Sequence, residues 1–252
     1  MYTNNMNSFY ICKTTRQPIH TEAENAKESD MRKRQKAAST LRYVSMGLMT
    51  ALTLTQLIPS LELAGIAVWI GLASFFIIEA IGAMPAGQSG LRFSTMGGEL
   101  KNGTVWFLIG LLACIQIIYV LSGYLIFGHA YIDYDMGRIF DVMKSDSIMR
   151  LLVIIPLSAW GEEIAWRGFF LSQKPEKASY LLWALCSSVL FAIGHVSQDA
   201  NPLVLFGTSS NLICSLILCG LFHQTKNCMI STVGHIIGNY AEIILILTVF
   251  WK

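Results

Sequence analysis

The sequence has little charge for its length. Asp, Glu, Lys and Arg make up 13% of the 252 residues, whereas hydrophobic residues make up 54%. Because soluble domains carry about 25% charged residues, this composition excludes an ordinary soluble domain and indicates a membrane protein. The formal net charge of +2 is too small to indicate a nucleic acid as partner.

Several familiar signals are also missing. The sequence has no HExxH motif and no internal repeat, and its six cysteines form no CxxC pair. Because five of the six lie in or beside apolar runs, we expect small buried thiols. Roughly forty polar residues precede the first apolar run, which argues against a cleaved signal peptide. The cysteines are Cys12, Cys114, Cys186, Cys214, Cys219 and Cys228.

The first 42 residues are polar and basic. Residues 1–42 are rich in Asn, Thr, Lys and Glu and lack an apolar period, so we expect a largely disordered tail, helical only near its basic end. Eight of the eighteen Lys and Arg lie here, five of them between Met31 and Arg42. This cluster predicts a cytoplasmic anchor that faces anionic lipid.

Apolar runs alternate with short polar breaks from residue 43 onward. Most approach the ~20 residues that a bilayer requires. With a cytoplasmic N-terminus, the inner segments hold thirteen Lys and Arg and the outer segments three, as the positive-inside rule requires. We therefore predict an all-α, polytopic bundle of about seven transmembrane helices over 43–252, in a multi-pass protein of a bacterial cell membrane. A re-entrant or amphipathic element at 129–147 would make eight. The predicted spans are 43–58, 61–82, 104–128, 148–172, 180–198, 203–222 and 229–251.

The fourth run contains the charged stretch "WGEEIAWRG", Trp160 to Gly168. Ten Leu, Ile, Val and Phe residues in 151–172 favour insertion by about 0.3–0.6 kcal/mol each. Three unpaired charges would oppose insertion by about 2.5–3.5 kcal/mol each. The charges must therefore be paired, protonated or turned toward a wet cavity inside the bundle.

Helix geometry separates the three charged residues of this stretch. Arg167 follows Glu163 by four residues, a spacing that favours an ion pair. Glu162 points to another face of the helix and is left unpaired. Pro156 should kink the helix and open room beside Glu162. The plainer interpretation is a buried polar lock that only holds helices together.

Two later runs offer partners for Glu162. The stretch "FAIGHVS" places His195 one turn beyond Phe191, and "STVGHIIGNYAE" places His235 and Asn239 on one helix face. At ~1.5 Å per residue, Glu162, His235 and Asn239 agree in depth within about one turn. His195 lies deeper than the other three residues, and a tilted helix or a shifted span boundary would be needed to place it at the same depth. We predict a shared site on this basis.

Other polar residues lie at membrane depth without an evident catalytic pattern. Core hydrogen bonding or protonation is the expected role of these side chains. They are Glu79, Gln116, Asn211, His223 and Glu242, of which Glu242 could also line the cavity beside Asn239.

Taken in order, these motifs resemble the CPBP family of intramembrane endopeptidases, which comprises CAAX proteases and bacteriocin-processing or self-immunity proteins. The similarity covers about 148–251, and the stretch Leu205 to Asn227 is similar to the helix and Thr-x-Asn turn that precede the family's last motif. The motifs are EExxxR (Glu162, Glu163, Arg167), FxxxH (Phe191, His195) and HxxxN (His235, Asn239).

The resemblance implies a CAAX-protease-like bundle that hydrolyses a peptide bond. Glu162 and His195 would bind and activate a water, and His235 and Asn239 would stabilise the oxyanion. Glu163 and Arg167 would support the site. The implied substrate is a membrane-associated, leader-type or CAAX-type peptide or protein, with the bilayer as the other partner; immunity could be the biological role.

Alternatives for the cofactor and the function stay open at this point. We expect no required cofactor, but zinc held by Glu162, His195 and His235 is the alternative. A non-catalytic or immunity-type scaffold of the same fold is the rival function, although the complete motif set argues against it. An ion-coupled transporter is favoured less, because the sequence lacks inverted repeats and paired broken helices.

Overall fold

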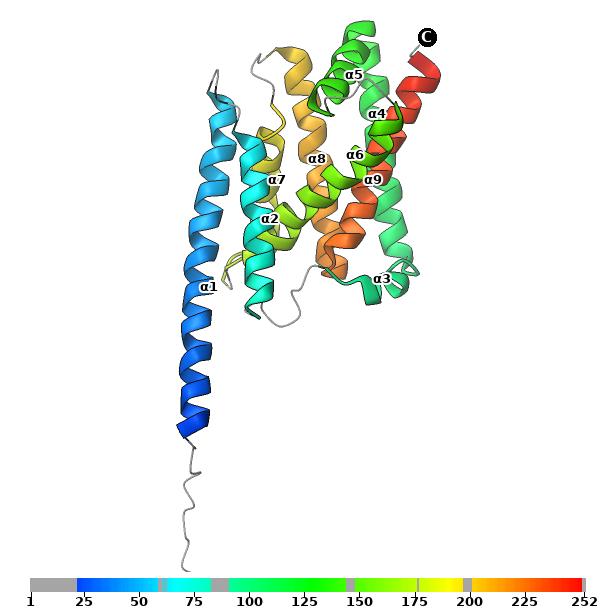
Figure 1. Cartoon of the computed structure of the whole chain (residues 1–252). Helices are drawn as coiled ribbons and strands as arrows, with labels where there is room; N and C mark the ends of the chain where they lie inside the picture. The colour runs from blue at the N-terminus through cyan, green and yellow to red at the C-terminus, as the bar shows by residue number, and fades with distance from the viewer. Residues whose placement is uncertain are drawn as a thin grey trace, which may run out of the picture.

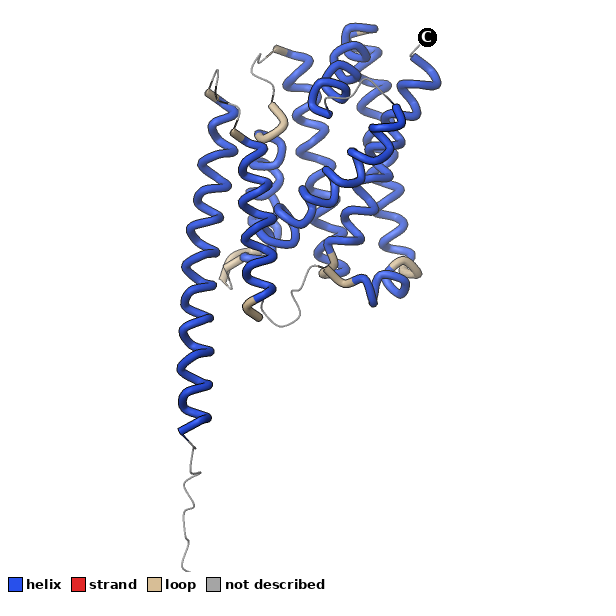
Figure 2. The backbone as a smooth tube through the Cα atoms, in the orientation of Figure 1, coloured by secondary structure: helices blue, strands red, loops and turns tan. Residues whose placement is uncertain are grey.

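The computed structural model describes residues 22–58, 61, 63–82, 91–143, 148–175, 177–196 and 201–250. All regular structure within these ranges is helical, and short loops join the helices (Figure 2). The helices form a bundle, beyond which the N-terminal half of α1 projects (Figure 1). The predicted all-α fold is confirmed for these residues.

Nine α-helices lie within the described residues. α6 continues as a π-helical segment, Ile164–Phe170, and a 3₁₀ turn, Leu171–Gln173; α9 continues as a second π-helical segment, Ile246–Phe250. A 3₁₀ turn, Thr55–Leu57, follows α1. The α-helices are α1 (Glu22–Leu54), α2 (Ala64–Ala80), α3 (Phe93–Glu99), α4 (Gly103–Phe127), α5 (His129–Met143), α6 (Ile148–Glu163), α7 (Tyr180–Ile193), α8 (Pro202–Thr225) and α9 (Cys228–Leu245).

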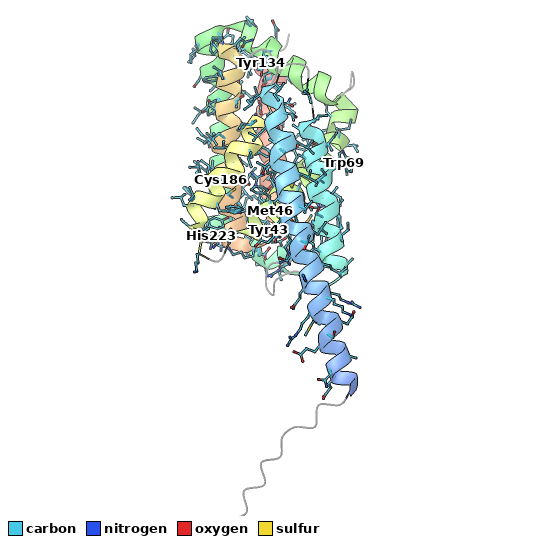
Figure 3. The ribbon with its side chains drawn as sticks, turned by 90° about the vertical axis from the view of Figure 1, so that its left-hand side faces the viewer. Tyr43, Met46, Trp69, Tyr134, Cys186 and His223 are labelled. Atoms are coloured by element: carbon cyan, nitrogen blue, oxygen red, sulfur yellow. The ribbon has the colours of Figure 1, made fainter. Side chains whose placement is uncertain are left out.

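Three of the seven predicted spans have the length and composition to cross a membrane. They are α4, α8 and α9 with its π-helical extension, while α2 and α7 are shorter apolar helices. Large apolar side chains on the outside of the bundle support the same conclusion. Trp69 is 71% exposed and Tyr43 is 72% exposed, and both lie on the outer face that Figure 3 shows. Such surfaces suit lipid rather than water.

Residues 22–42 form the first half of α1. A helix was expected at the basic end of this tail, from Met31 to Arg42, but not over residues 22–30. Two ion pairs at the i,i+4 spacing support the exposed helix: Arg32 with Glu28 at 2.6 Å and Arg34 with Asp30 at 2.9 Å. The apolar half of α1 packs on α2, where the Ser74 hydroxyl donates to the Ser45 hydroxyl at 2.7 Å. The polar half thus continues a helix that packing already fixes. Residues 1–21 lie outside the described part of the chain.

A helix occupies the region in which an eighth element was considered. α5 packs its buried residues Tyr131 and Met136 against Val120 of α4 and Ile246 after α9. The Tyr131 ring comes so close to α4 that a Cβ on Gly123 would lie 2.5 Å from it. Gly123 is therefore required for this approach. The short helix α3 has no counterpart among the predicted spans.

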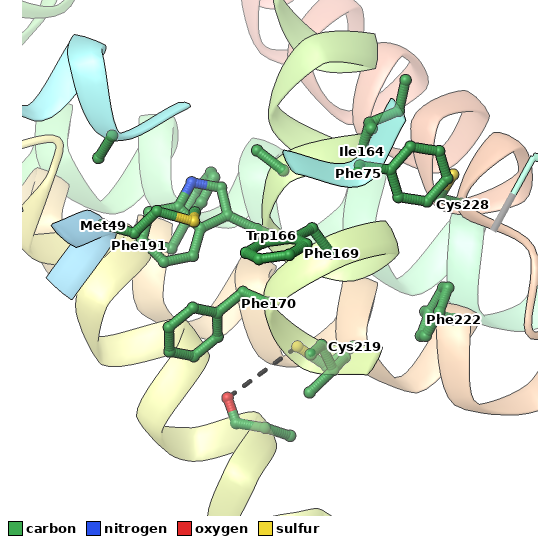
Figure 4. Packing of buried hydrophobic residues seen from close by; sticks show 14 of the residues in the cluster. Met49, Phe75, Ile164, Trp166, Phe169, Phe170, Phe191, Cys219, Phe222 and Cys228 are labelled. Atoms are coloured by element: carbon green, nitrogen blue, oxygen red, sulfur yellow. Dashed lines mark hydrogen bonds between the residues drawn. The ribbon is translucent and has the colours of Figure 1, made fainter. Parts of the chain in front are cut away.

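Aromatic side chains fill the core around the π-helical segment after α6. Trp166 and Phe170 have ring centroids 5.5 Å apart, and Phe170 stacks on Trp183 of α7 at 5.6 Å. Phe75 of α2 and Phe191 of α7 join the same cluster, which Figure 4 shows. This packing surrounds Ile164–Phe170 with apolar surface, and all seven residues of that segment are buried.

The turn between α8 and α9 is fixed by Asn227, whose side chain is fully buried. Its oxygen accepts from the Met229 amide at 3.1 Å and so caps α9. Its amide nitrogen donates to the Glu99 carboxylate at 2.6 Å and to the Arg92 carbonyl at 2.9 Å. These bonds join α3 to the start of α9, and they set the position of the residues two turns further along α9.

The five cysteines with described positions form no disulfide with any described residue. Three are buried as expected, whereas two are exposed on the apolar outside of the bundle. Cys12 lies outside the described residues. The buried thiols are Cys214, Cys219 and Cys228, and the exposed ones are Cys114 and Cys186.

Candidate active site

α6 runs obliquely across the neighbouring helices and carries the charged stretch into the middle of the bundle (Figure 1). The change from α- to π-helical hydrogen bonding begins immediately after Glu163. π-Helical turns inside helices are rare and often mark functional sites. Here the wider turn presents the Arg167 side chain to the bundle interior, where it is completely buried.

The ion pair predicted from the four-residue spacing is present. Arg167 Nη1 donates to Glu163 Oε1 at 2.9 Å, and both side chains have 0% exposure. A buried charge pair is stable only when further hydrogen bonds satisfy its remaining groups. Arg167 Nη2 supplies such bonds by donating to the Ser215 hydroxyl at 2.8 Å and the Ser215 carbonyl at 3.2 Å.

The pair is also anchored to α7. The Ser215 hydroxyl donates to the Ser188 hydroxyl at 3.0 Å, and the Arg167 guanidinium lies 4.8 Å from the centroid of the Phe191 ring. Arg167 therefore connects α6 to α7 and α8 in one buried polar network.

His235 makes a contact that the sequence spacing did not reveal. Its Nδ1 lies 3.0 Å from Glu163 Oε1, the same oxygen that accepts from Arg167. A carboxylate can only accept, so Nδ1 carries the proton in this hydrogen bond. Glu163 thus fixes the orientation of the imidazole, and Nε2 is the nitrogen that faces Glu162.

Glu162 lies beside His235 and is less buried than Glu163. Its Oε2 is 4.0 Å from His235 Nε2, and its side chain is 18% exposed against 0% for Glu163. The Ser158 hydroxyl, one turn earlier on α6, donates to Glu162 Oε1 at 2.9 Å. Glu162 has no cationic partner as close as the one that Glu163 has. This arrangement agrees with the predicted difference between the two carboxylates.

His195 lies in the turn that follows α7, not within a helix as the predicted span would have it. Its Nδ1 is 2.8 Å from the Phe191 carbonyl, so Nδ1 carries a proton and Nε2 is the acceptor nitrogen of the neutral ring. The Phe191 ring lies 4.5 Å from the His195 ring and 6.1 Å from the His235 ring. Phe191 therefore connects the two imidazoles.

The turn that carries His195 is also held from α1. Gln56, in the 3₁₀ turn after α1, donates from Nε2 to the Val196 carbonyl at 3.1 Å. The position of His195 thus depends on a residue that is more than a hundred positions away in the sequence.

Asn239 lies one turn beyond His235 on the same face of α9, and its side chain is partly buried. Close packing of α9 on its neighbours depends on two glycines. A Cβ on Gly234 would lie 2.7 Å from Leu221, and one on Gly238 would lie 3.2 Å from Leu112. The glycines therefore let α9 approach α8 and α4, as their positions beside His235 and Asn239 suggested.

The three residues considered as zinc ligands do not fit a metal site. Among the described residues, no group of three or more His, Cys, Asp or Glu side chains could hold a metal ion. Glu162, His195 and His235 are therefore not arranged as a coordination set in this structure.

Two of the other polar residues at membrane depth satisfy each other. Gln116 Nε2 donates to Glu242 Oε2 at 3.0 Å, and Gln116 Oε1 accepts from the Ser210 hydroxyl at 2.9 Å. The expected core hydrogen bonding is confirmed for Gln116 and Glu242. His223 lies in the last turn of α8, where its ring is 4.0 Å from that of Tyr180.

Glu79 and Asn211 show no such bond. Glu79 lies in the last turn of α2 and is partly buried, so it is near an end of the bundle rather than at its centre. The Asn211 Nδ2 is buried without a partner among the described residues, so the expected hydrogen bonding is not observed for that atom.

Sequence reasoning missed three residues that support the site. Ser158 could have been found, because it precedes Glu162 by four residues on one helix face. Ser215 and Ser188 gave no comparable signal, since their roles depend on how α6, α7 and α8 pack.

The fold and the site define a membrane-embedded helical protein with a carboxylate and an imidazole facing each other inside the bundle. Residues 144–241 match the family model of type II CAAX prenyl endopeptidases, Rce1-like. This segment contains the motifs from which the sequence predicted a resemblance to the CAAX protease (CPBP) family, and the family match agrees with that prediction. No curated protein and no solved structure matches the chain significantly.

Proposed function

We propose that this protein is an intramembrane endopeptidase that uses Glu162 to activate a water molecule. The observation that carries the proposal is the pairing of Glu162 with His235, whose other nitrogen binds the buried Glu163–Arg167 pair. A partly exposed carboxylate within a bundle, next to an oriented imidazole, is suited to general acid–base chemistry. The family match supports the same class of reaction.

The reaction begins with water held between Glu162 and His195. Glu162 removes a proton from the water as its oxygen attacks the scissile carbonyl carbon. The 4.0 Å between Glu162 Oε2 and His235 Nε2 is too long for a direct hydrogen bond, so each of these two atoms can bond to a reacting group instead. The Ser158 hydroxyl keeps Oε1 in place while Oε2 faces the reacting atoms.

His235 and Asn239 then stabilise the tetrahedral oxyanion. For His235 to donate from Nε2, the ring must carry protons on both nitrogens, because Nδ1–H already binds Glu163. Asn239 contributes its amide one turn away. Each oxyanion donor is commonly worth about 2.7–4 kcal/mol of transition-state stabilisation.

Collapse of the intermediate breaks the carbon–nitrogen bond. The proton that Glu162 took from water passes to the departing amine, so that a carboxylic acid and an amine are the products. Glu163 and Arg167 take no part in proton transfer in this scheme. They hold His235 at the orientation that the oxyanion requires.

The substrate class is a membrane-associated peptide, of the CAAX or the leader type. The experiment compares membrane proteomes of cells that express wild-type protein or Glu162→Gln, and searches for peptides shortened only by the wild type. Purified protein is tested in parallel on a farnesylated peptide with a C-terminal CAAX sequence and on the same peptide without the lipid.

The outcomes separate the two substrate types from a non-catalytic role. Cleavage of the farnesylated peptide alone indicates CAAX processing, while cleavage of both or new proteomic products indicates a broader endopeptidase. If no peptide differs between wild type and Glu162→Gln in either assay, the proposed activity is wrong and a scaffold of the same fold becomes the better account.

A further inference from the structure

Pro156 leaves a backbone carbonyl of α6 without its helical donor. In an α-helix the N–H of each residue donates to the carbonyl four residues earlier, and proline has no N–H. Pro156 lies inside α6, so the Leu152 carbonyl cannot receive its usual bond. Leu152 is 50% exposed on the outside of the bundle, and a lipid surrounding would offer its carbonyl no other donor.

Tyr240 of α9 supplies the missing bond. Its hydroxyl donates to the Leu152 carbonyl at 3.0 Å. The Tyr240 ring packs against the cluster of Leu151 and Ile155 from α6 with Ile243 from α9. A tyrosine suits this place because the ring fills an apolar contact while the hydroxyl reaches a polar atom.

This bond is a second connection between the helices that carry the proposed catalytic groups. The first connection joins His235 to Glu163 near the C-terminal end of α6. The second joins Tyr240 to Leu152 near its N-terminal end. Asn239 lies between His235 and Tyr240 in the sequence of α9, immediately before Tyr240. Two connections fix both the distance between α6 and α9 and the angle at which they cross, whereas a single connection would let α9 rotate about it.

We propose that Tyr240 is a positioning residue for peptide-bond hydrolysis, acting by holding Asn239 in register with Glu162. The proposal rests on the proposed endopeptidase function. The hydroxyl has this role because Pro156 removes the N–H that would otherwise occupy the Leu152 carbonyl. Loss of the hydroxyl lets the outer part of α9 shift on α6, and small displacements of a catalytic donor have large effects on rate.

The test measures kcat and KM for the farnesylated CAAX peptide with purified Tyr240→Phe, which keeps the ring and removes the hydroxyl. We expect kcat to fall about tenfold, while KM changes by less than about twofold because substrate binding does not use the hydroxyl. Unchanged kcat in a folded Tyr240→Phe protein overturns the proposal.

A second pair of variants distinguishes positioning from general stability. If Tyr240 acts through Asn239, then Tyr240→Phe should reduce the residual rate of an Asn239→Ala protein by less than about twofold. The same tenfold loss in both backgrounds would show that the hydroxyl does not act through Asn239.

Tyr180→Phe is the matched control, because the Tyr180 hydroxyl also donates to a backbone carbonyl, that of Cys219 at 2.6 Å, at the other end of the bundle. This variant should lower the midpoint of thermal unfolding about as much as Tyr240→Phe and leave kcat unchanged. An equal loss of kcat in both Tyr→Phe variants would show that the loss comes from general destabilisation, and it would overturn the proposal. If wild type and Glu162→Gln cleave the peptide equally, the proposed function is at fault instead, whatever Tyr240→Phe does.

Discussion

Glu163 combines two tasks in one carboxylate oxygen. Its Oε1 accepts from Arg167 at 2.9 Å and from His235 at 3.0 Å, inside a site from which solvent is excluded. The neighbouring Glu162 is partly exposed, and among the described residues no Arg or Lys pairs with it, so the two adjacent carboxylates have different surroundings. This contrast makes the two carboxylates separable by experiment.

Replacing Glu163 by Gln should destabilise the fold strongly. The change leaves the Arg167 charge buried without its counter-ion, and breaking a buried pair typically costs about 3–5 kcal/mol. Glu162→Gln should lower the free energy of unfolding by about 1 kcal/mol or less. The amide side chain of this variant can still accept a hydrogen bond from Ser158, although a neutral acceptor makes that bond weaker. Thermal unfolding in detergent compares the two, and equal stability of both variants would contradict the assigned difference.

Ser158 should matter for rate more than for stability. Ser158→Ala removes the bond to Glu162 Oε1, and a hydrogen bond to a charged group is worth about 1.5–3 kcal/mol. We expect kcat to fall at least about tenfold. The control is Ser209→Ala on α8, which removes a hydroxyl that donates to the Tyr119 hydroxyl of α4 and to the Phe206 carbonyl of α8. This variant should keep the wild-type kcat. A wild-type rate for Ser158→Ala would show that Glu162 does not need this support.

At the scale of elements, α9 carries two of the proposed catalytic groups and depends on Asn227 at its start. Asn227→Ala removes the α9 cap and the bonds to Arg92 and Glu99, so we expect a loss of about 2–3 kcal/mol. Since α3 also loses its attachment, trypsin should cleave more rapidly after Arg92 and Lys101. Asn201→Ala removes only the cap of α8 and should leave that cleavage unchanged. Unaltered digestion of Asn227→Ala would refute the proposed attachment of α3.

Contacts within one helix could be predicted from the sequence, and contacts between helices mostly could not. The Glu163–Arg167 pair follows from a four-residue spacing, which brings side chains together in a helix whatever its neighbours are. The Glu163–His235 bond requires the oblique crossing of α6 and α9, which no local pattern determines. The same limit applies to Tyr240, whose acceptor becomes available only because Pro156 lies on the other helix.

Element boundaries show a similar division. Apolar runs located the helical segments, but the end of α7 at Ile193 and the helix over residues 22–30, before the basic end of the tail, were not anticipated. In the first case His195 stands in a turn because a bond from Gln56 and its own bond to Phe191 hold it there. In the second case, the polar composition favours disorder, but side-chain ion pairs and the packed half of α1 stabilise the helix.

At the scale of the whole molecule, the site draws on segments outside the stretch that matches the family. Gln56 holds the turn of His195, and Phe75 of α2 packs in the core around the π-helical segment. Residues 144–241 thus contain all the proposed catalytic residues, while the helices before them pack around these residues.

Removal of metal by a chelator tests the whole molecule, because a metal-dependent enzyme would lose its activity together with its metal. Among the described residues, the candidate ligands do not form a group that could hold a metal ion. We therefore expect dialysis against a strong chelator to leave cleavage of the farnesylated peptide unchanged. Loss of activity on chelation, with recovery on adding zinc, would contradict the proposal that Glu162 and His195 activate the water without a metal.

The most direct test of the central claim is the initial rate of peptide cleavage by purified Glu162→Gln relative to wild type, at equal amounts of folded protein. The account predicts that the amide, which cannot take a proton from water, lowers the rate by at least about a hundredfold, while the unfolding midpoint stays close to that of the wild type. Cleavage by folded Glu162→Gln at the wild-type rate would contradict it.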